Sequence, residues 1–405
     1  MVLFTGVQRL ARQLRSTGFM AACLRERDES VSSPQDVDLW IPYDPEDLDG
    51  LEAWVKEWPL RDRVVAVINR RERRVMEHAV LNQALNRPGI RPAQAMILRD
   101  KLLLRETLAK RAPHLNPQFQ EVHFESSSIP LVSLPFLLKP RNLFKSQLIT
   151  LCRDLADWEG AYSELPLKVS SAGQRHGVRI KDSFVAEAYA QGREFSLDVF
   201  FALDGEMIPT PAVELTPARH WGMEDFHVAV RRLPARFSTE EEALLSQAVA
   251  DLAVALDLRA TPMHVDLVLV DRGALVLDAA PRIGGYRSEM MDLAHGAPLD
   301  PLSVDLAMGK SIRWEPKRNK SVAVVEIFPP EPGRLAAIHG LEQVRQLRSF
   351  HRLRQRIAPG ASVGWARDGF RCPVFVVLTH EAHEVVTEDV EALPRFLRVE
   401  VVRPP

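Results

Sequence analysis

The stretch from His264 to Gly285 places two runs of branched apolar residues on either side of the short break Asp271–Gly273. This pattern predicts a β-hairpin with a three-residue loop, in which Gly273 takes the left-handed conformation that the loop needs. Each run also carries one acid, Asp266 in the first and Asp278 in the second. If the residues that flank the loop pair with each other, the two carboxylates face each other, with Cβ atoms roughly 4.5–5.5 Å apart.

Two facing carboxylates destabilise a sheet unless one is protonated or a cation lies between them. Mg²⁺ is usually held by one or two carboxylates together with phosphate oxygens, so Asp266 and Asp278 are candidate metal ligands. The alternative is that one acid is exposed and the other ends its strand, so that each is simply solvated. A register shift of one residue would separate the two acids, and both interpretations stay open at this point.

Composition and charge exclude several classes of protein. The chain has 405 residues, 46% hydrophobic and 26% charged, which is enough for two or three packed units. Lys plus Arg number 52 against 54 for Asp plus Glu, so no basic surplus indicates nucleic acid. The N-terminal apolar part is too short for a signal peptide, and no run could span a membrane. With three widely spaced cysteines, we expect a cytoplasmic protein with neither a nucleic-acid nor a membrane partner.

Residues 1–95 alternate helical and strand patterns, which predicts a small α/β unit with a parallel sheet. No G-x-G-x-x-G follows the first strand, so a dinucleotide site is unsupported. The proline-bearing segment that follows is typical of a boundary. One helix is then expected at 93–113, and strands are expected at 129–140 and 167–171. Strand patterns return at the end of the chain, beyond Arg313.

Five short motifs occur in order along the chain: LRDK, FLLKP, VAEAYAQGREFSLDV, MHVDL and LVLDAAPRIGG. The series resembles the ATP-grasp superfamily, and most of all its branch of carboxylate–amine ligases that includes the L-amino-acid ligases. The resemblance implies an α/β (α+β ATP-grasp) fold over essentially the whole chain. Its expected parts are a Rossmann-like N-terminal unit at 1–95, an ATP-grasp domain at 96–320 with a mobile lid at about 114–189, and a small α+β subdomain at 321–405.

The resemblance also implies a chemistry. ATP with Mg²⁺, or Mn²⁺ in its place, would phosphorylate a carboxylate to an acylphosphate, which an amine attacks to form an amide, with release of ADP and phosphate. The expected partners are a small-molecule carboxylate and a small-molecule amine, both amino acids or similar metabolites. A homodimer is one expected assembly, because dimers are common among the enzymes that the chain resembles. The alternatives are carboxylation with bicarbonate and an ATP-binding regulatory protein without catalysis.

The nucleotide site implied by the resemblance has a phosphate-contacting lysine, a lid lysine, a hinge whose backbone reads adenine, and an acid for the ribose hydroxyls. These positions are Lys101, Lys139, then Glu187, Ala188, Tyr189 and Ala190, and Glu194. Taken one at a time, such residues are as easily explained as solvated surface groups.

Asp266 and Asp278 match the two metal-ligand positions. Arg282 matches the arginine that stabilises the acylphosphate and, with Lys139, is the expected catalytic residue. As an alternative, Arg282 could merely form a structural ion pair with Asp278. Asp is a good Mg²⁺ ligand, although the family usually has Glu at the second position.

The chain departs from the family pattern in two places. The loop after the lid lysine lacks the usual glycines, and Lys145 and Ser146 are proposed to replace them as side-chain donors to phosphate. The asparagine expected two residues after Asp278 is Ala280, which removes one metal or phosphate contact.

Three residues near the motifs are candidate substrate contacts. His264 lies on the same strand face as Asp266, although a core histidine is an equal alternative. Arg287 and Glu289 follow PRIGG and are candidates to bind a carboxylate and an amino group. The polar aromatic segment Arg219–His227 is either a surface loop or a wall of the amine pocket. The letters HEAHE at 380–384 lack the spacing of a zinc motif and predict a polar turn before a helix.

Overall fold

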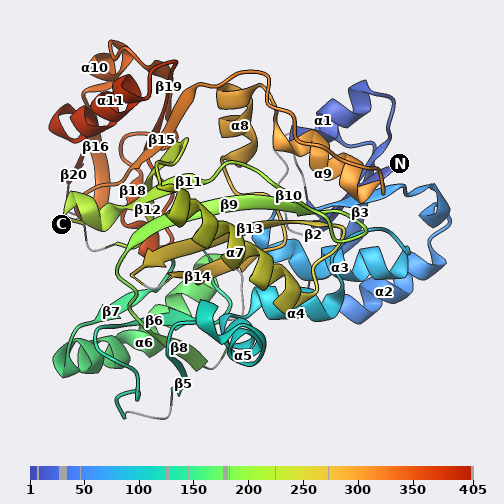
Figure 1. Cartoon of the computed structure of the whole chain (residues 1–405), viewed down its shortest axis with the longest axis horizontal. Helices are drawn as coiled ribbons and strands as arrows, with labels where there is room; N and C mark the ends of the chain where they lie inside the picture. The colour runs from blue at the N-terminus through green and yellow to red at the C-terminus, as the bar shows by residue number, and fades with distance from the viewer. Residues whose placement is uncertain are drawn as a thin grey trace.

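The computed structural model of the protein describes residues 1–402 apart from 7–8, 27–33, 46, 125–127, 145, 177–180, 182, 224 and 272, and it describes residues 168 and 170–176 by their backbone alone. The described residues form four sheets: an N-terminal sheet, a large central sheet, a lid sheet and a small C-terminal sheet (Figure 1). None of the helices they form has the length and apolar character that crossing a membrane requires.

The N-terminal sheet is parallel, as the alternating pattern predicts, with strand order β3-β2-β1-β4. Its strands are β1 (Val2–Phe4), β2 (Ala21–Glu26), β3 (Leu39–Tyr43) and β4 (Ala66–Ile68). Its helices are α1 (Arg9–Ser16), α2 (Leu48–Glu57) and α3 (Val75–Ala84). The strand order reverses at β1, which lies between β2 and β4, and ligands of open parallel sheets bind beside such a switch point.

The central sheet has the strand order β14-β13-β9-β11-β12-β15-β19-β17, with β10 paired to β9. Its strands are β9 (Arg193–Phe201), β10 (Met207–Pro209), β11 (Val213–Pro217), β12 (Val228–Leu233), β13 (Thr261–Val270), β14 (Gly273–Ala280), β15 (Ser321–Ile327), β17 (Phe350–Gln355) and β19 (Val374–His380). Strands from the last part of the chain therefore extend the same sheet that holds the hairpin.

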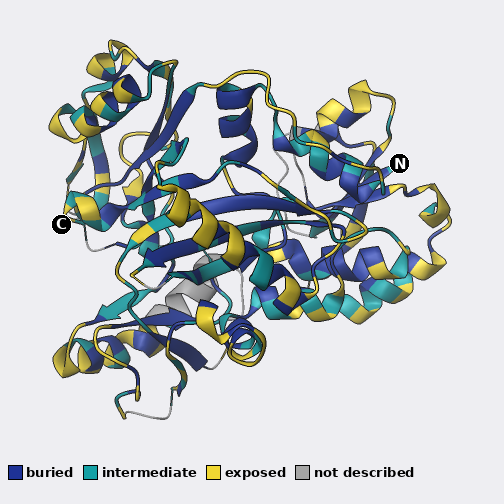
Figure 2. Ribbon diagram, viewed as in Figure 1, coloured by how far each residue is buried: buried dark blue, intermediate teal, exposed yellow. Residues whose placement is uncertain are grey.

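Helices cover both faces of the central sheet, so that its strands are buried between them (Figure 2). One face packs against α4 (Pro92–Arg99), α5 (Lys101–Arg111) and α7 (Thr239–Leu256), and part of the other packs against α8 (Arg287–His295) and α9 (Leu299–Ala307). Phe195, Leu197 and Val199 of β9 belong to the first core. Because side chains alternate along a strand, the residues between them point to the opposite face.

The lid sheet is antiparallel, in the order β5-β8-β6-β7. It comprises β5 (Phe119–His123), β6 (Phe136–Pro140), β7 (Thr150–Cys152) and β8 (Ser183–Ala188), with α6 (Leu155–His176) packed on it through Trp158 and Leu165. The C-terminal sheet, β18-β16-β20, comprises β16 (Gly333–His339), β18 (Ser362–Val363) and β20 (Arg398–Val402), beside α10 (Leu341–Arg345) and α11 (His383–Phe396). As predicted, the turn after His380 leads directly into a helix.

Two predictions near the lid are wrong. The single helix expected at 93–113 is broken at Asp100, whose extended backbone ends α4 and whose carboxylate caps α5 by accepting from the Leu102 N–H at 3.0 Å. The break makes Lys101 the first residue of α5. The expected strand at 167–171 is part of α6, because Leu165 and Val169 lie one helical turn apart and both pack on the lid sheet.

The hairpin pairs Asp266 with Asp278, but its loop is not the predicted one. Val270 pairs with Gly273, so the loop has two residues and Gly273, at φ 144°, opens β14. With that loop alone, Asp266 would face Leu277. A β-bulge leaves Leu277 unpaired as an extra residue, and Asp266 therefore pairs with Asp278 instead.

Arg105 on α5 accounts for the bulge and joins the lid to the central sheet. Its guanidinium donates to the carbonyls of Val276 at 2.7 Å and of the bulged Leu277 at 3.1 Å. The same group donates to both carboxylate oxygens of Glu187 on β8, at 2.8 and 2.9 Å, and Lys139 on β6 contacts Glu187 at 2.6 Å. All three charged side chains are buried. Arg105 therefore fixes both the register of the hairpin and the attachment of the lid.

We expect Arg105→Met to lower the free energy of unfolding by about 3–5 kcal/mol, because it leaves a buried carboxylate with one partner fewer and frees two buried carbonyls. Urea unfolding measures the loss. The control is Arg111→Met on the same helix, an exposed residue that donates to the Ala255 carbonyl at 2.9 Å. Equal losses for the two variants would contradict the assigned role.

Candidate active site

One face of the central sheet carries a row of polar side chains on three adjoining strands. Directly paired residues of antiparallel strands project to the same side. The pairings of β13 with β9 and β14 place on this face Glu194, Ser196, Asp198, His264, Asp266, Asp278 and Ala280. We call this set the acidic face. It is the side of the sheet opposite α7.

His264 joins two carboxylates of the acidic face. Its Nδ1 lies 3.2 Å from Asp198 Oδ2 and its Nε2 lies 3.4 Å from Asp266 Oδ1. Asp198 also accepts from the Gly284 N–H at 2.7 Å. Burial alone would raise the pKa of Asp266, but His264 and then Arg287 hold that pKa below its ordinary value. His264, a predicted substrate contact, thus lies between Asp198 and Asp266 and next to a predicted metal position.

The carboxyl of Asp278 is affected by the repulsion from Asp266 that the sequence predicts. Burial raises the pKa of its carboxyl, and the negative charges of Glu72 and Asp266 raise it further, while Lys101 opposes the shift. The two facing acids are therefore neither widely separated nor simply solvated. A cation beside Asp278 would relieve this repulsion.

Glu187, the first residue of the predicted hinge, has its side chain buried in the interior. The Glu187 carboxylate is occupied by Arg105 and by Lys139, so only its backbone is left for a ligand. The N–H groups of Ala188 and Tyr189 donate to the carbonyls of Gln118 and Pro135 at 2.8 and 2.9 Å. Two of the expected hinge amides thus hold the lid sheet together. Ala190 follows them, outside the strand.

Glu194 lies between the hinge and the acidic face. Burial raises the pKa of its carboxyl to about 7, with Asp266 adding to the shift and Arg219 and Lys139 opposing it. Arg219 lies over the Tyr189 ring, 4.7 Å from its centroid, and over the Phe226 ring at 5.5 Å. Arg219 and Phe226 of the segment Arg219–His227 therefore lie beside the predicted hinge.

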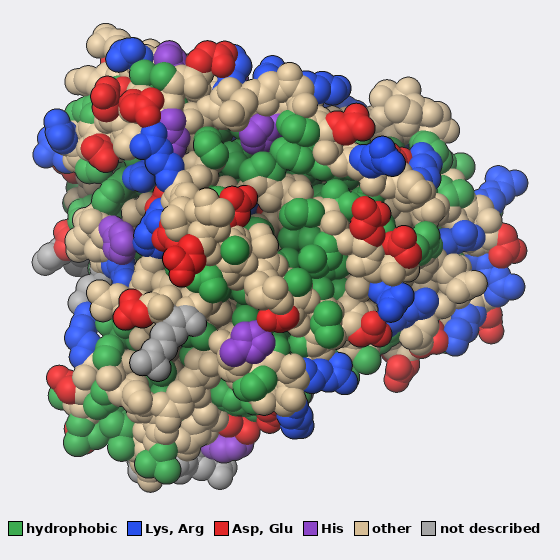
Figure 3. Space-filling model, viewed as in Figure 1, with side chains coloured by type: hydrophobic (Ala, Val, Ile, Leu, Met, Phe, Trp, Pro, Cys, Tyr) green, Lys and Arg blue, Asp and Glu red, His purple; other side chains and the backbone are tan. Residues whose placement is uncertain are grey.

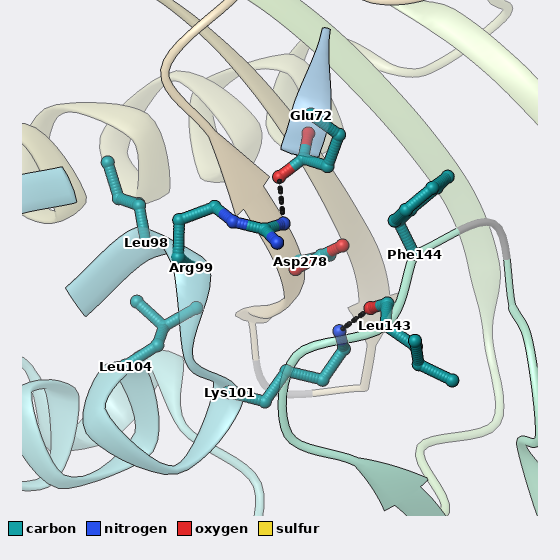
Figure 4. A pocket seen from close by; sticks show the side chains of 8 residues that line it. All are labelled: Glu72, Leu98, Arg99, Lys101, Leu104, Leu143, Phe144 and Asp278. Carbon is teal, nitrogen blue, oxygen red and sulfur yellow. Dashed lines mark hydrogen bonds and ion pairs between the residues drawn. The ribbon is translucent and has the colours of Figure 1, made fainter. Parts of the chain in front are cut away.

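Lys101 and Asp278 line one small pocket together with Glu72, Leu98, Arg99, Leu104, Leu143 and Phe144 (Figure 4). Lys101 donates from Nζ to the Leu143 carbonyl at 2.6 Å. Leu143 and Phe144 belong to the loop that follows the lid lysine, so this loop closes the pocket against the acids. The predicted phosphate lysine thus has a lid carbonyl as its partner.

The glycine-free lid loop still adopts the backbone conformation that glycine favours. Ser146 has φ 57° and Leu148 has φ 56°, which costs roughly 1–2 kcal/mol for a residue with a side chain. Ser146 Oγ donates to the Phe226 carbonyl at 3.2 Å, and the Leu148 N–H donates to the Arg367 carbonyl at 2.9 Å. These bonds attach the loop to the segment Arg219–His227 and to the C-terminal part. Lys145, the other predicted phosphate donor, lies outside the described residues.

A residue that the sequence analysis missed positions Arg282. Glu72, in the loop after β4, accepts from Arg282 at 2.6 Å and from Arg99 at 3.2 Å. Arg282 is thus paired with Glu72 of the N-terminal unit, and its alternative structural pairing with Asp278 is not what the structure contains. The sequence did hold a signal that could have identified Glu72. The polar run NRRERR follows an apolar strand directly, and parallel sheets bind ligands at the carboxyl ends of their strands.

Arg287 and Glu289 lie at the start of α8 but point to different places. Arg287 is buried, lies 3.2 Å from Asp198 and donates to Ser196 Oγ. Glu289 pairs with Arg352 on β17. Arg287 thus reaches the acidic face, whereas Glu289 reaches the C-terminal strands, and their expected contacts with a carboxylate and an amino group stay predictions.

Another buried carboxylate, that of Glu326, lies farther along the side of the central sheet that carries the acidic face. Glu326 on β15 accepts from the Tyr286 hydroxyl at 2.7 Å and from Arg231 at 3.1 Å, with His227 at 3.3 Å and Arg356 at 3.7 Å. Tyr286 follows the hairpin, and the cluster joins the part of the sheet that holds the hairpin to its C-terminal strands. We call it the Glu326 cluster.

The donors present fit a metal shared with a phosphate ligand. Within the described residues, no three His, Cys, Asp or Glu side chains come together to hold an ion unaided. Asp266 and Asp278 supply two hard carboxylates, and His264 Nε2 lies 3.4 Å from Asp266 Oδ1, longer than an ordinary N–H···O hydrogen bond. Mg²⁺ commonly takes one or two carboxylates with phosphate oxygens. Ala280 adds no ligand.

The side of the molecule drawn in Figure 3 shows no large area of one charge among the described residues. On the side drawn in Figure 3, basic and acidic side chains are interspersed rather than gathered by sign. This agrees with the near balance of 52 basic and 54 acidic residues.

Two family models match the chain. Residues 132–290 match the ATP-grasp domain, and residues 326–402 match the L-amino acid ligase C-terminal domain 2. No curated protein sequence matches the chain. The first match contains the acidic face and the hinge, and the second contains Glu326.

Solved structures share the fold over nearly the full length. L-amino acid ligase from Bacillus licheniformis is 19% identical with a TM-score of 0.81, over 99% of this chain and 98% of that chain. N5-carboxyaminoimidazole ribonucleotide synthetase from Thermotoga maritima is 16% identical with a TM-score of 0.69, over 99% of both. The biotin carboxylase domain of Hydrogenobacter thermophilus 2-oxoglutarate carboxylase is 13% identical with a TM-score of 0.65, over 98% and 90%. The ATP-grasp fold predicted from the motifs is confirmed.

Glu194→Gln tests the environment of the site through pH. In the folded protein the pKa of Glu194 is about 7, above its ordinary 4.5, so the cost of ionising it is absent below pH 4.5 and fully present above pH 7. We expect the Tm of the variant to exceed that of the wild type at about pH 8 and the gap to shrink at about pH 5. Exposed Glu242→Gln is the control. A gap that does not change with pH would contradict the assignment.

Proposed function

We propose that this chain, which carries an ATP-grasp domain and an L-amino acid ligase C-terminal domain, is an ATP-dependent ligase that joins a carboxylate to an amine. The observation that carries the proposal is the pocket in which Lys101 and Asp278 lie beside the Glu72–Arg99 ion pair, next to the facing pair of acids. Both substrates are proposed to be amino acids or similar metabolites.

The nucleotide is assigned to the space between the lid and the acidic face. Lys139 is fixed by Glu187 at the end of β6, where its ammonium can reach a phosphate. The backbone after Glu187 is assigned to adenine, and Glu194 to the ribose hydroxyls. The Tyr189 ring, with Arg219 over it, gives the base an apolar and cationic neighbour.

Asp266 and Asp278 are assigned to hold Mg²⁺, or Mn²⁺, against the phosphates, which relieves the repulsion between the two carboxylates. Lys101 would exchange the Leu143 carbonyl for a phosphate oxygen. Arg282, held by Glu72, is assigned to neutralise the charge that develops on the transferring phosphoryl group and on the acylphosphate.

The chemistry that ATP supplies when bound is a phosphoryl group, which converts the carboxylate to an acylphosphate that the amine then attacks, with ADP and phosphate released. The residues of the chain bind and orient the reactants and exclude water. Leu143 and Phe144 already cover the pocket. Arg287 and the Glu326 cluster lie beyond the acidic face and are assigned to the amine side of the reaction.

Carboxylation with bicarbonate is the second candidate, since the fold is shared with a biotin carboxylase domain. A regulatory protein without turnover is the third candidate. Its support is that Ala280 supplies no metal or phosphate contact and that Leu143 and Phe144 of the lid loop line the pocket beside Asp278.

One experiment separates these candidates. ADP release is measured with ATP and Mg²⁺ against amino acids singly and in pairs, and against bicarbonate, with products identified by mass spectrometry. A condensed product with particular pairs is expected, and Asp278→Asn should reduce its rate by about 100-fold or more, since it removes one of two metal carboxylates. ADP release with bicarbonate alone would favour carboxylation, and nucleotide binding without any release would favour a regulatory protein.

Phe144→Gly should strengthen ADP binding by about threefold to tenfold, because less of the lid loop has to leave the pocket when the phosphates enter. Isothermal titration with MgADP measures the affinity. The control is Leu131→Gly, a residue of the lid that is 86% exposed. Weaker binding in the Phe144 variant would mean that its ring supports the nucleotide rather than displaces it.

A further inference from the structure

The carboxyl ends of β1 and β4 meet at the switch point of the N-terminal sheet, where open parallel sheets bind ligands. The residue after β1 is Thr5, and the residues after β4 are Asn69 and Arg70. The same short loop delivers Glu72 to Arg282. This edge of the sheet therefore borders the proposed active site through the contact of Glu72 with Arg282.

The side chain of Asn69 is hydrogen-bonded at this edge through its oxygen, while its amide nitrogen has no partner among the described residues. Its Oδ1 accepts from Thr5 Oγ1 and from the Arg71 N–H, both at 2.9 Å. The residue is only 7% exposed, and its Nδ2 is buried without a partner among the described residues. A buried donor without a partner costs about 1–3 kcal/mol, so such a group calls for an explanation. The two accepted bonds fix which end of the amide remains available.

Arg70 supplies a second donor of the same kind. Its Nε lies 3.3 Å from Asp300 at the start of α9, while its Nη1 is buried and has no partner in the described part of the chain. Asp198 and Arg282 are both near enough to act on its charge. Arg70 therefore lies between the switch point and the acidic face.

An oxyanion is the ligand that these donors fit. Asn69 Nδ2 and Arg70 Nη1 can both donate, while other atoms of Arg70 and Arg282 already contact Asp300 and Glu72. A carboxylate offers several acceptor lone pairs, and hydrogen bonds to charged groups are the stronger ones. The nucleotide does not account for these donors, because its assigned residues lie on the lid side, at Lys101 and Lys139.

We propose that Asn69 and Arg70 form the site that binds a carboxylate of the acid substrate, so that the N-terminal unit holds this substrate beside Arg282. The assignment rests on the proposed ligase function. It gives the two unpartnered donors a common ligand and gives the loop after β4 two tasks, substrate binding through Asn69 and Arg70 and positioning of Arg282 through Glu72. A phosphate group on a substrate has the same oxyanion chemistry, and the experiment distinguishes the two.

The test is anion binding to the full chain saturated with MgADP, so that the nucleotide site is filled. Succinate and inorganic phosphate are titrated separately, with the rise in Tm and the calorimetric Kd as readouts. The variants are Asn69→Asp, which keeps the oxygen that Thr5 and Arg71 use but replaces the free donor by an acceptor, and Arg70→Gln. The matched controls with the same charge changes are Gln83→Glu and Arg73→Gln, both exposed on the same unit.

We expect succinate to bind the wild type and both controls, and to bind each of the two variants at least about tenfold more weakly, the loss of one charged hydrogen bond. Phosphate binding in preference to succinate, with the same dependence on the variants, would move the assignment from a carboxylate to a phosphate-bearing substrate. Binding that is equal in all five proteins, or absent from the wild type, would overturn the site.

Folding is checked by the Tm of each variant without anion, and Arg70→Lys serves if Arg70→Gln is unstable, because it keeps the charge but loses the planar donor pair. Binding needs no turnover. Succinate binding at Asn69 and Arg70 without ADP release from any substrate would therefore overturn the ligase and leave the anion site standing. Substrate-dependent ADP release with unchanged KM values in both variants would overturn the site and leave the ligase standing.

Discussion

The buried contact between Arg105 and Glu187 is the interaction on which the rest of the molecule depends. One guanidinium binds a lid carboxylate and two carbonyls of β14, so it ties the orientation of the lid to the register of the hairpin. The bulge at Leu277 exists where Arg105 takes its carbonyl, and this bulge brings Asp278 opposite Asp266. Burying charge is expensive unless every group is paired. Here each of the three buried charges has an opposite partner, because the Glu187 carboxylate pairs with both Arg105 and Lys139.

The proposed chemistry needs groups from parts of the chain that have separate sheets. The central sheet supplies the acids, the lid supplies Lys139, and the N-terminal unit supplies Glu72, which holds Arg282. Each part alone has an ordinary hydrophobic core. Charged residues at their junctions are satisfied only when the parts are assembled, so the packing of the units and the geometry of the site are one problem. The bonds from Ser146 and Leu148 extend this coupling to the loop over the pocket.

The lid loop lacks glycine, yet two of its residues adopt a backbone conformation that favours glycine. Ser146 and Leu148 adopt left-handed conformations that glycine would adopt at no cost. Strain of this kind persists only where surrounding contacts hold it, and it is concentrated at functional segments. Bonds to Phe226 and Arg367 provide those contacts. The loop is thereby held against Lys101, which is where the proposed phosphates must enter.

Local periodicity in the sequence was enough to predict the parallel N-terminal sheet and the hairpin. The ATP-grasp fold was predicted from the resemblance of five ordered motifs to a known family. The sequence also indicated the facing acids, although the loop length and the bulge that bring them together were not predictable. Those depend on Arg105, more than 160 residues away in sequence from its carbonyl partners. The break before Lys101, the pairing of Glu72 with Arg282 and the unpartnered donors of Asn69 and Arg70 were decided by tertiary structure alone. Contacts between distant segments leave no periodic trace in a sequence, and only packing chooses which charges meet.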